Sequence, residues 1–462
     1  MKRILIAAFL VLAAAPVAFA QQRPTSPRAL PHVLLIGIDT LRGDHLACSG
    51  NDWIRTPNID ALAADGVLFT RCFSTAPWTL PSFASIFTGK TPYHHGAVGF
   101  DYQRLDDDNY TLTEFFDIAG YRTNGFVSIN YLTPEFGMGQ GFNGDAPQGL
   151  DPDLDRASRI TWLGLETLRT HDLNQPLFMF LHYFDVHAPY TPPAPYAGMY
   201  YHGDEMAPGE PVLDFLRSDA NPARNRNSGM YDWLEGITDL EFGVKEYAAG
   251  VTFVDDHVGQ LMTHLKDEGL YDGMLIVLVS DHGEHLGDHG YWFTHAEPYQ
   301  ECLHVPLLIK FPKGSFAGTV VEAPISTMDL MPTMLETVGI RPPEMDGRSL
   351  LPLCAGQAGS VGSLLVAEQG GSVEGFSKAL IDWPWKLIYR RAKDVETYQL
   401  FDLNTDPGET NDLASVHEAK AGRMRMRMWR IFDPENPLVE GRGAIPADVD
   451  EETRKRLEAL GY

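Results

Sequence analysis

Short apolar runs recur along the chain, and several of them end at an acidic residue. Residues 32–38 form a nearly continuous apolar run that ends at Asp39. Such a run suits a strand that is buried on both faces of a parallel sheet. Runs of the same kind predict further strands at residues 125–129, 177–183, 274–280 and 305–311.

Helical patterns lie between these runs, at residues 60–64, 112–119, 157–170 and 246–268. Alternation of strands and helices predicts an α/β fold with helices on both faces of the sheet. In sheets of this type, ligands bind at the carboxyl ends of the strands. Asp39, Asp185 and Asp281 each stand at or just beyond such an end.

Two stretches depart from this alternation. Residues 192–236 are irregular and rich in proline and tyrosine, which favours a lid or specificity loop over a plain surface loop. Residues 355–363 resemble a linker. Short strand patterns at 364–368, 376–381, 385–390 and 397–402 then predict a small antiparallel sheet, and a terminal helix is expected at 446–460. We therefore expect an α/β domain over residues 30–355 and a C-terminal subdomain over residues 364–462.

The first 20 residues have the pattern of a secretory signal peptide. Lys2 and Arg3 precede an apolar run at residues 4–17, and Ala18-Phe19-Ala20 supplies the small residues of a cleavage site. Cleavage after Ala20 would give a periplasmic or secreted protein. A retained membrane anchor is the alternative, but the run is short for a span. Later apolar runs are interrupted, so we expect no stable membrane insertion after signal removal.

Charge and cysteine content narrow the function classes. Lys and Arg total 36 against 62 Asp and Glu, a formal net charge of −26. This balance argues against nucleic acid as a partner. It leaves an anionic substrate open, because a bound metal can invert the local field. The four cysteines show no zinc-finger or redox spacing, and their pairing stays open (Cys48, Cys72, Cys302 and Cys354).

Thr79 is the candidate nucleophile. Pro81 suits the first position of a helix, and Phe83 and Phe87 would then share one buried face. Thr79 would stand just before the helix N-terminus, where the helix dipole favours negative charge. A threonine hydroxyl needs a base or a metal to become a nucleophile. The alternative is an ordinary N-terminal capping threonine.

The metal that would activate Thr79 has three candidate ligands: Asp39, Asp281 and His282. Two carboxylates and an imidazole at strand ends, with the Thr79 hydroxyl between them, form a plausible site for a divalent cation. A bound ion would lower the pKa of that hydroxyl and hold an ester oxygen. Further histidines stand in residues 181–190 and 288–295.

Residues 78–90 resemble the signature of the sulfatase family. That signature reads Cys or Ser, any residue, Pro, Ser, Arg, and later Thr-Gly-Arg, and its first residue is oxidised to formylglycine. Thr79 holds this first position, where oxidation would give a ketone, and Phe83 replaces the arginine.

Other segments extend the resemblance over almost the whole chain. Residues 38–46 are similar to the opening metal motif, although Thr40 replaces the usual second aspartate. Residues 280–287 resemble the second metal motif. Additional matches lie at 55–63, 400–413 and 457–462. Motifs in this order and spacing are far more specific than one short match.

The resemblance implies a fold and a set of roles. Sulfatases share with alkaline phosphatases a large, mostly parallel mixed sheet between helices, and they have a smaller C-terminal antiparallel sheet. Several phosphoryl-handling branches use threonine as the nucleophile. By resemblance, the metal ligands would be Asp39, Thr79, Asp281 and His282. His187 and His295 would contact ester oxygens or hold a second metal with Asp185. Lys90 and His95 would frame the entrance, although Lys90 equally suits a structural cation at a helix end.

These inferences favour an exported, metal-dependent hydrolase of a small anionic ester. The ion would be Ca, Zn, Mn or Mg, in one or two copies. Threonine favours phosphoric or phosphonic esters, and hydrolysis of sulfuric esters is the alternative. A catalytically silent metal-binding protein is the competing hypothesis from another class. The alcohol part of the ester and the oligomeric state stay open.

Overall fold

The first apolar run forms β1 (Val33–Ile38), in which every residue is buried. Val33 and Leu35 belong to one hydrophobic cluster, while Leu34, Ile36 and Ile38 belong to another. Successive side chains of a strand point to opposite faces, so β1 is buried on both sides. The unbroken apolar pattern of this segment follows from that position.

The protein is described by a computed structural model. It describes residues 30–98, 103–147, 156–218, 229–295, 297–357, 365–372, 375–432, 445–447, 449–451 and 453–455. The predicted signal peptide lies outside these residues. Pro31–Tyr462 form one compact unit, which contains a large central sheet and a smaller antiparallel sheet.

The central sheet has eight strands, in the order β10-β2-β9-β6-β1-β5-β4, with β11 also paired to β2. Its other strands are β2 (Val67–Phe73), β4 (Arg122–Phe126), β5 (Leu177–Tyr183), β6 (Leu275–Ser280), β9 (His304–Lys310), β10 (Thr319–Val321) and β11 (Ile325–Ser326). Parallel pairs join β1 to β5 and β6, whereas β9 is antiparallel to both of its neighbours. The predicted mixed, mostly parallel sheet is confirmed.

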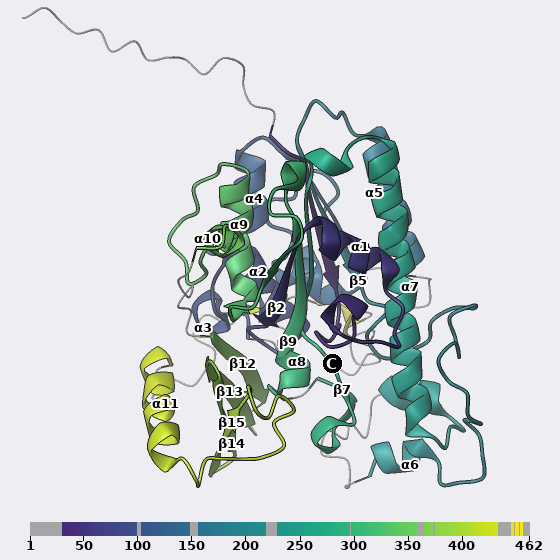
Figure 1. Cartoon of the computed structure of the whole chain (residues 1–462), viewed down its shortest axis with the longest axis vertical. Helices are drawn as coiled ribbons and strands as arrows, with labels where there is room; N and C mark the ends of the chain where they lie inside the picture. The colour runs from purple at the N-terminus through teal and green to yellow at the C-terminus, as the bar shows by residue number, and fades with distance from the viewer. Residues whose placement is uncertain are drawn as a thin grey trace, which may run out of the picture. The chain divides into compact units, whose positions relative to one another are not determined.

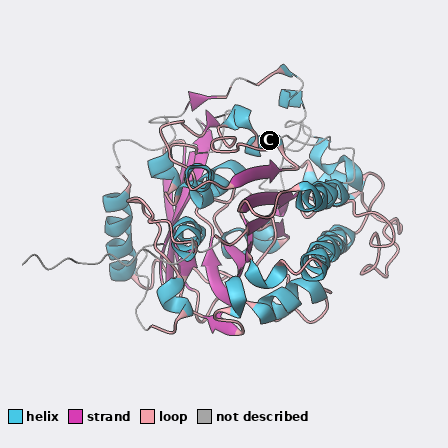
Figure 2. Cartoon of the chain, turned by 90° about the horizontal axis from the view of Figure 1, so that it is seen from above, coloured by secondary structure: helices cyan, strands magenta, loops and turns pink. Residues whose placement is uncertain are grey.

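Helices cover both faces of the central sheet (Figures 1 and 2). One face is covered by α2 (Thr79–Thr88), α4 (Leu112–Ile118) and α9 (Leu330–Thr337), and the other by α1 (Pro57–Asp65), α5 (Arg156–Thr170) and α7 (Leu240–Asp267). Shorter helices are α3 (Pro92–His95), α6 (Val212–Leu216), α8 (Gln300–Leu303) and α10 (Leu351–Cys354). The two hydrophobic clusters therefore lie between the sheet and these two helical layers.

The C-terminal part contains an antiparallel sheet of four strands in sequential order. Its strands are β12 (Leu365–Ser372), β13 (Gly375–Asp382), β14 (Trp385–Ala392) and β15 (Val395–Asp402), and α11 (Glu418–Ile431) packs on one face (Figure 1). Two further two-stranded sheets pair β3 (Gln103–Arg104) with β16 (Ile445–Pro446), and β7 (His285–Leu286) with β8 (Trp292–Thr294). The small sheet contacts the main part through the Glu368 backbone N–H, which donates to the Thr75 carbonyl at 2.9 Å.

Some predicted boundaries were wrong for identifiable reasons. β4 begins three residues earlier than its apolar run, because Thr123 and Asn124 bond the flanking segment 141–145 and do not need apolar neighbours. β9 is antiparallel, and an apolar run carries no information about strand direction. Pro446 does not begin the terminal helix but pairs with Gln103 in β16. Residues 456–462 lie outside the described part.

The insert at 192–236 is anchored on α7. The hydroxyl of Tyr196 donates to Asp256, that of Tyr201 donates to Asp239, and the Gly198 N–H donates to Glu246. These bonds tie residues 196–201 of the insert to α7 and to Asp239, the N-cap residue directly before it. Its role as a lid stays a prediction.

The helices and the cysteines of the described residues bear on two expectations from the sequence, namely membrane insertion and cysteine pairing. Within the described residues, no helix is long and apolar enough to cross a bilayer. All four cysteines are free thiols in this structure. Cys72 is fully buried in the hydrophobic cluster below α2, as expected for a structural side chain.

Close packing between β1 and α2 leads to a stability prediction. A Cβ atom on Gly37 would come within 2.7 Å of Phe83 Cζ, and Phe83 is fully buried. Gly37→Ala should therefore lower the free energy of unfolding by about 1–3 kcal/mol, the usual cost of overpacking. Gly273→Ala, where no atom lies within 4 Å of the new Cβ, is the matched control. Equal thermal midpoints for the two variants would contradict this account.

Candidate metal centre

The ends of β1 and β6 bring two acidic residues together. Ile38 is paired with Ser280 in the parallel register, so Asp39 and Asp281 follow at the same edge of the sheet. Both carboxylates and the adjacent His282 are fully buried. The strand-end argument from the sequence is therefore confirmed for these three residues.

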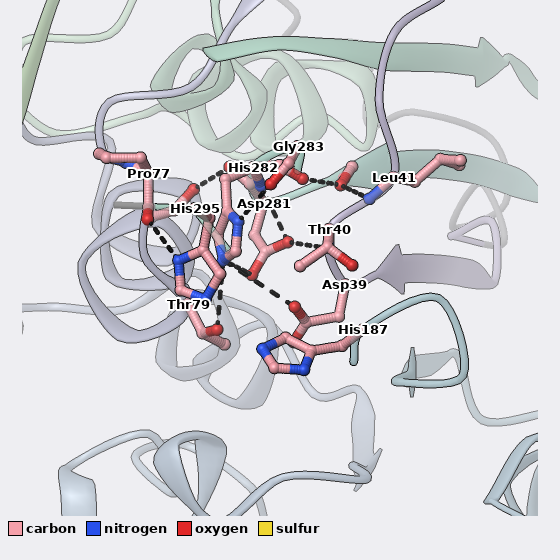
Figure 3. A network of polar contacts seen from close by, with 12 residues as sticks. Asp39, Thr40, Leu41, Pro77, Thr79, His187, Asp281, His282, Gly283 and His295 are labelled. Atoms are coloured by element: carbon pink, nitrogen blue, oxygen red, sulfur yellow. Dashed lines mark hydrogen bonds and ion pairs between the residues drawn. The ribbon is translucent and has the colours of Figure 1, made fainter. Parts of the chain in front are cut away.

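Their side chains converge on a small volume (Figure 3). His282 Nε2 lies 3.4 Å from Asp281 Oδ2 and 3.9 Å from Asp39 Oδ1. One potential ligand atom from each of the three residues lies within 4.8 Å of the other two. Carboxylate oxygens and an imidazole nitrogen at such spacing are the donor set that divalent metals accept. The residues present therefore fit the ion that the sequence predicts.

Thr79 joins this group from α2. Its Oγ1 lies 3.4 Å from His282 Nε2 and the residue is fully buried. The structure places Thr79 at the first helical position, not just before the helix, because Trp78 is the N-cap residue and has an extended backbone. Its alternative role as a capping threonine is thus wrong. The first-turn position still presents the hydroxyl at the positive end of the helix dipole.

The two buried carboxylates perturb each other. Burial raises the pKa of Asp281 well above its usual value, and the neighbouring charge of Asp39 raises it further. Backbone N–H groups of His282 and Thr40 donate to Asp281 Oδ1 at 2.9 and 3.3 Å and oppose the rise only in part. Proton uptake or a cation would relieve this repulsion.

Three histidines share one hydrogen-bonding pattern. The Nδ1 atom of His282 bonds the Gly283 carbonyl at 3.0 Å, that of His295 bonds Pro77 at 2.8 Å, and that of His187 bonds Ala188 at 2.6 Å. A carbonyl only accepts, so each Nδ1 carries the proton and a neutral ring keeps its lone pair on Nε2. Metal-ligating histidines are commonly held in this way.

Burial reinforces the neutral state of two of these rings. It lowers the pKa of His282 to about 3, and it lowers that of His295 well below its usual value. The His282 and His295 ring centres lie 4.3 Å apart, and His187 lies 5.5 Å from His295 (Figure 3). The predicted pair His187 and His295 therefore stands beside the candidate metal centre.

Asp185 does not join the ligand group that the described residues form. Burial raises the pKa of Tyr183, and the charge of Asp185 contributes to that rise. The Tyr183 hydroxyl itself bonds Thr161 on α5 at 3.0 Å. A second metal held by Asp185 with His187 and His295 stays a prediction.

Lys90 and His95 both bond polar neighbours, and their expected place at the entrance to the site stays a prediction. Lys90 follows the C-terminal end of the 10-residue helix α2, about 15 Å along the axis from Thr79. Its Nζ donates to Asn109 Oδ1 at 2.9 Å. His95 is buried, and its Nε2 lies 3.0 Å from Ser85 Oγ on α2.

His182 is a site residue to which the sequence assigned no role. Its Nε2 lies 3.3 Å from Asp39 Oδ2, on the carboxylate oxygen that does not face His282. The ring is fully buried, and the edge of Phe83 packs against it at 5.2 Å between centroids. Phe83, which holds the place of the signature arginine, thus faces an imidazole whose Nε2 lies within ion-pair distance of Asp39. The sequence did contain one indication of this role. His182 is the next-to-last residue of β5, and in the parallel register it pairs with Gly37, two residues before Asp39.

Comparisons with known proteins show which proteins this chain is similar to. Residues 31–340 match the sulfatase family model, and residues 287–431 match the model for the C-terminal part of N-sulphoglucosamine sulphohydrolase. An arylsulfatase of Clostridium perfringens is 26% identical over 448 residues, covering 84% of this chain and 91% of the relative. The multifunctional alkaline phosphatase superfamily protein PehA of Trinickia caryophylli is 28% identical over 404 residues, with 70% and 77% covered.

A solved structure adds a phosphorus-handling neighbour. The phosphonate monoester hydrolase SpPMH from Silicibacter pomeroyi superposes with a TM-score of 0.70 and 26% sequence identity. The superposition covers 91% of this chain and all of that one. The match spans the central sheet and the smaller C-terminal sheet alike.

The raised pKa of Asp281 predicts how the metal-free protein responds to pH. A carboxyl whose pKa is raised on folding binds more protons in the folded state than in the unfolded state. Stability is then full below the unfolded pKa of about 4 and falls as the pH rises toward the folded value. In chelator-treated protein, Asp281→Asn should flatten this fall and raise the free energy of unfolding at pH 8 by on the order of 1 kcal/mol.

Denaturant unfolding between pH 4 and pH 8 measures this effect. Asp394→Asn, which changes an exposed carboxylate, is the control and should follow the wild type. A lower stability of Asp281→Asn at pH 8 in chelator would contradict the strain assigned to the carboxylate pair.

Proposed function

This chain belongs to the sulfatase family, and from that membership we propose that it hydrolyses a small anionic ester with Thr79 as the nucleophile. Members of the family are ester hydrolases, and the chain is accordingly a sulfatase-like hydrolase. The observation that carries the proposal is the 3.4 Å distance from Thr79 Oγ1 to His282 Nε2, inside the cluster of Asp39 and Asp281. A buried hydroxyl at a helix N-terminus beside two carboxylates suits an activated nucleophile.

Each residue of the site has its own role in the proposed reaction. Asp39, Asp281, His282 and Thr79 Oγ1 would hold the ion, which when bound lowers the pKa of the hydroxyl and neutralises ester oxygens. Thr79 Oγ1 gives up its proton as it forms a bond to phosphorus or sulfur, and the bond to the alcohol oxygen breaks as that oxygen leaves with the electron pair and takes up that proton. Water then cleaves the threonyl ester and restores the hydroxyl. His187 and His295 stand beside the centre, where their unprotonated Nε2 atoms would accept the Thr79 proton and pass it to the leaving oxygen.

Phosphoric or phosphonic esters are the favoured substrates. Thr79 has the methyl group that prevents conversion to the formylglycine aldehyde, so the attacking group is the hydroxyl itself. Phe83 takes the place of the signature arginine and is fully buried against Phe180 and His182. The phosphonate monoester hydrolase neighbour supports this choice. Hydrolysis of sulfuric esters is the second candidate, because the arylsulfatase relative covers most of the chain.

The donor set favours one transition-metal ion. Imidazole nitrogen combined with carboxylate oxygen suits Zn or Mn better than Ca, which prefers oxygen alone. The described residues around Thr79 bring together one ligand group, so we propose a single ion there. A catalytically silent metal-binding protein is the less favoured alternative, because Thr79 keeps a hydroxyl 3.4 Å from His282 Nε2, which a protein that only binds the ion does not need.

Export is proposed from the first 20 residues alone. Lys2 and Arg3, the apolar run and Ala18-Phe19-Ala20 support cleavage after Ala20. Amino-terminal sequencing of protein recovered outside the cytoplasm should begin at Gln21. Recovery of exported protein that still begins at Met1 would contradict cleavage.

Substitution of Thr79 tests the nucleophile. Thr79→Ala should abolish turnover while the fold stays intact, because it removes the group that forms the covalent bond. Thr79→Ser keeps the hydroxyl and should retain part of the activity. The assay is a panel of aryl sulfate, phosphate monoester, phosphate diester and phosphonate monoester, each with Zn²⁺, Mn²⁺, Mg²⁺ and Ca²⁺.

The same panel separates the two candidate substrates. Thr79→Cys, produced with a formylglycine-generating enzyme, should gain aryl sulfatase activity if the pocket is a sulfatase pocket with a changed nucleophile. Wild-type cleavage of the sulfate ester faster than every phosphorus ester would refute the phosphorus preference. Full activity in Thr79→Ala would refute the nucleophile.

A further inference from the structure

The turn that carries Asp39 has a strained backbone. Thr40, directly after it, has a φ of +52°, in the left-handed region. β-Branched residues rarely adopt this conformation, and it persists only where surrounding contacts determine it. Some group must therefore hold the turn, and with it the Asp39 carboxylate.

Part of this support comes from the β6 side. The Thr40 N–H donates to Asp281 Oδ1 at 3.3 Å, and the Leu41 N–H donates to Ser280 Oγ at 2.9 Å (Figure 3). Both bonds link the turn to the loop that carries the other candidate ligands. Asp281 is itself a candidate ligand, so its bond to Thr40 cannot fix the turn independently of the centre.

Further support that does not depend on a candidate ligand comes from α7. The Tyr247 hydroxyl donates to the Thr40 carbonyl at 2.8 Å and accepts from the Arg42 N–H at 3.0 Å. One hydroxyl thus bridges the Thr40 carbonyl and the Arg42 N–H, which flank Leu41 directly after the strained residue. Tyr247 is fully buried, and its ring packs edge-on against His45 and Tyr190 at 5.2 and 5.4 Å between centroids. Its hydroxyl therefore has a fixed position on a 28-residue helix.

We propose that Tyr247 is a positioning residue that clamps the Asp39–Arg42 turn and thereby keeps the Asp39 carboxylate in the metal centre. The inference rests on the metal centre proposed above. Tyr247 acts through the backbone of the turn. Its ring packs in the core, so the hydroxyl is the part of the side chain that the clamp requires.

Tyr247→Phe removes the hydroxyl and keeps the aromatic ring, so it tests the hydroxyl alone. The variant keeps the packing but leaves the Thr40 carbonyl and the Arg42 N–H without this partner. The turn can then relax, and Asp39 moves out of the ligand group. Supporting residues of this kind usually change metal affinity by about 10–100-fold, and we expect a loss in that range.

Tyr183→Phe is the matched control. Tyr183 is equally buried and belongs to the same hydrophobic cluster, but its hydroxyl bonds Thr161 on α5 and not the turn. Mn²⁺ titration of the full chain, with free ion counted by electron paramagnetic resonance, gives the dissociation constant directly. Thermal unfolding in chelator reports any general loss of stability in the two variants.

A second variant tests the strain itself. Glycine adopts left-handed backbone angles without a Cβ penalty, so Thr40→Gly removes the need for a clamp. Tyr247→Phe should then weaken Mn²⁺ binding much less in the Thr40→Gly background than in the wild type. Equal fold-losses in the two backgrounds would show no coupling and would overturn the clamp.

The outcomes distinguish a failure of the proposed metal centre from a failure of the proposed role of Tyr247. Wild-type protein that binds no Mn²⁺, and no Zn²⁺ in the corresponding competition assay, would refute the metal centre and the clamp together. Wild-type binding with an unchanged affinity in Tyr247→Phe would overturn the clamp alone. A loss shared equally by Tyr183→Phe would also overturn it, since the effect would then come from the core in general.

Discussion

The approach of two buried carboxylates at neighbouring strand ends is the constraint on which the site depends. Parallel pairing of β1 with β6 puts Asp39 and Asp281 at one edge of the sheet. Burial and mutual repulsion raise the pKa of Asp281, so the arrangement is costly unless a cation or a proton neutralises it. The lone pairs of the surrounding histidines and the Thr79 hydroxyl fit a cation better than a proton.

The surrounding structure holds the two loops that carry these carboxylates. Arg42 donates to Asp44 and Asp288, which ties the β1 turn to the loop after β6. Farther along that loop, the Gln300 N–H donates to Glu409 at 2.7 Å, and Glu409 pairs with buried Lys386 at 2.8 Å. Glu409 and Lys386 belong to the C-terminal part. This part therefore stabilises the loop that carries Asp281, His282 and His295, although its anchoring residues stand outside the ligand group.

A second cluster of possible ligand atoms is formed by His289, Glu301 and Glu409, which also lie close to one another. In this cluster, Lys386 already supplies a counter-charge through its ion pair with Glu409.

The sequence was sufficient for the elements whose burial is uniform and for residues at strand ends. It predicted β5 with its observed bounds and β1 and β6 to within one residue, together with the convergence of Asp39, Thr79, Asp281 and His282. It could not predict the direction of β9, because apolar patterning is the same for both directions. It could not show where the side chains of Asp185 and Lys90 point, because proximity to a motif along the chain does not fix the direction of a side chain. It gave no role to His182 or Tyr247, whose importance depends on partners about 140 and 200 positions away in the chain.

Anomalous X-ray diffraction from crystals grown with Mn²⁺ or Zn²⁺ would test the central claim most directly. The account predicts one strong anomalous peak at about 2.0–2.2 Å from atoms of Asp39, Asp281 and His282, with Thr79 Oγ1 in the same coordination sphere. A peak at His289, Glu301 and Glu409 with none beside Thr79 would contradict it. The absence of any peak beside Asp39 and Asp281 at saturating metal would contradict it equally.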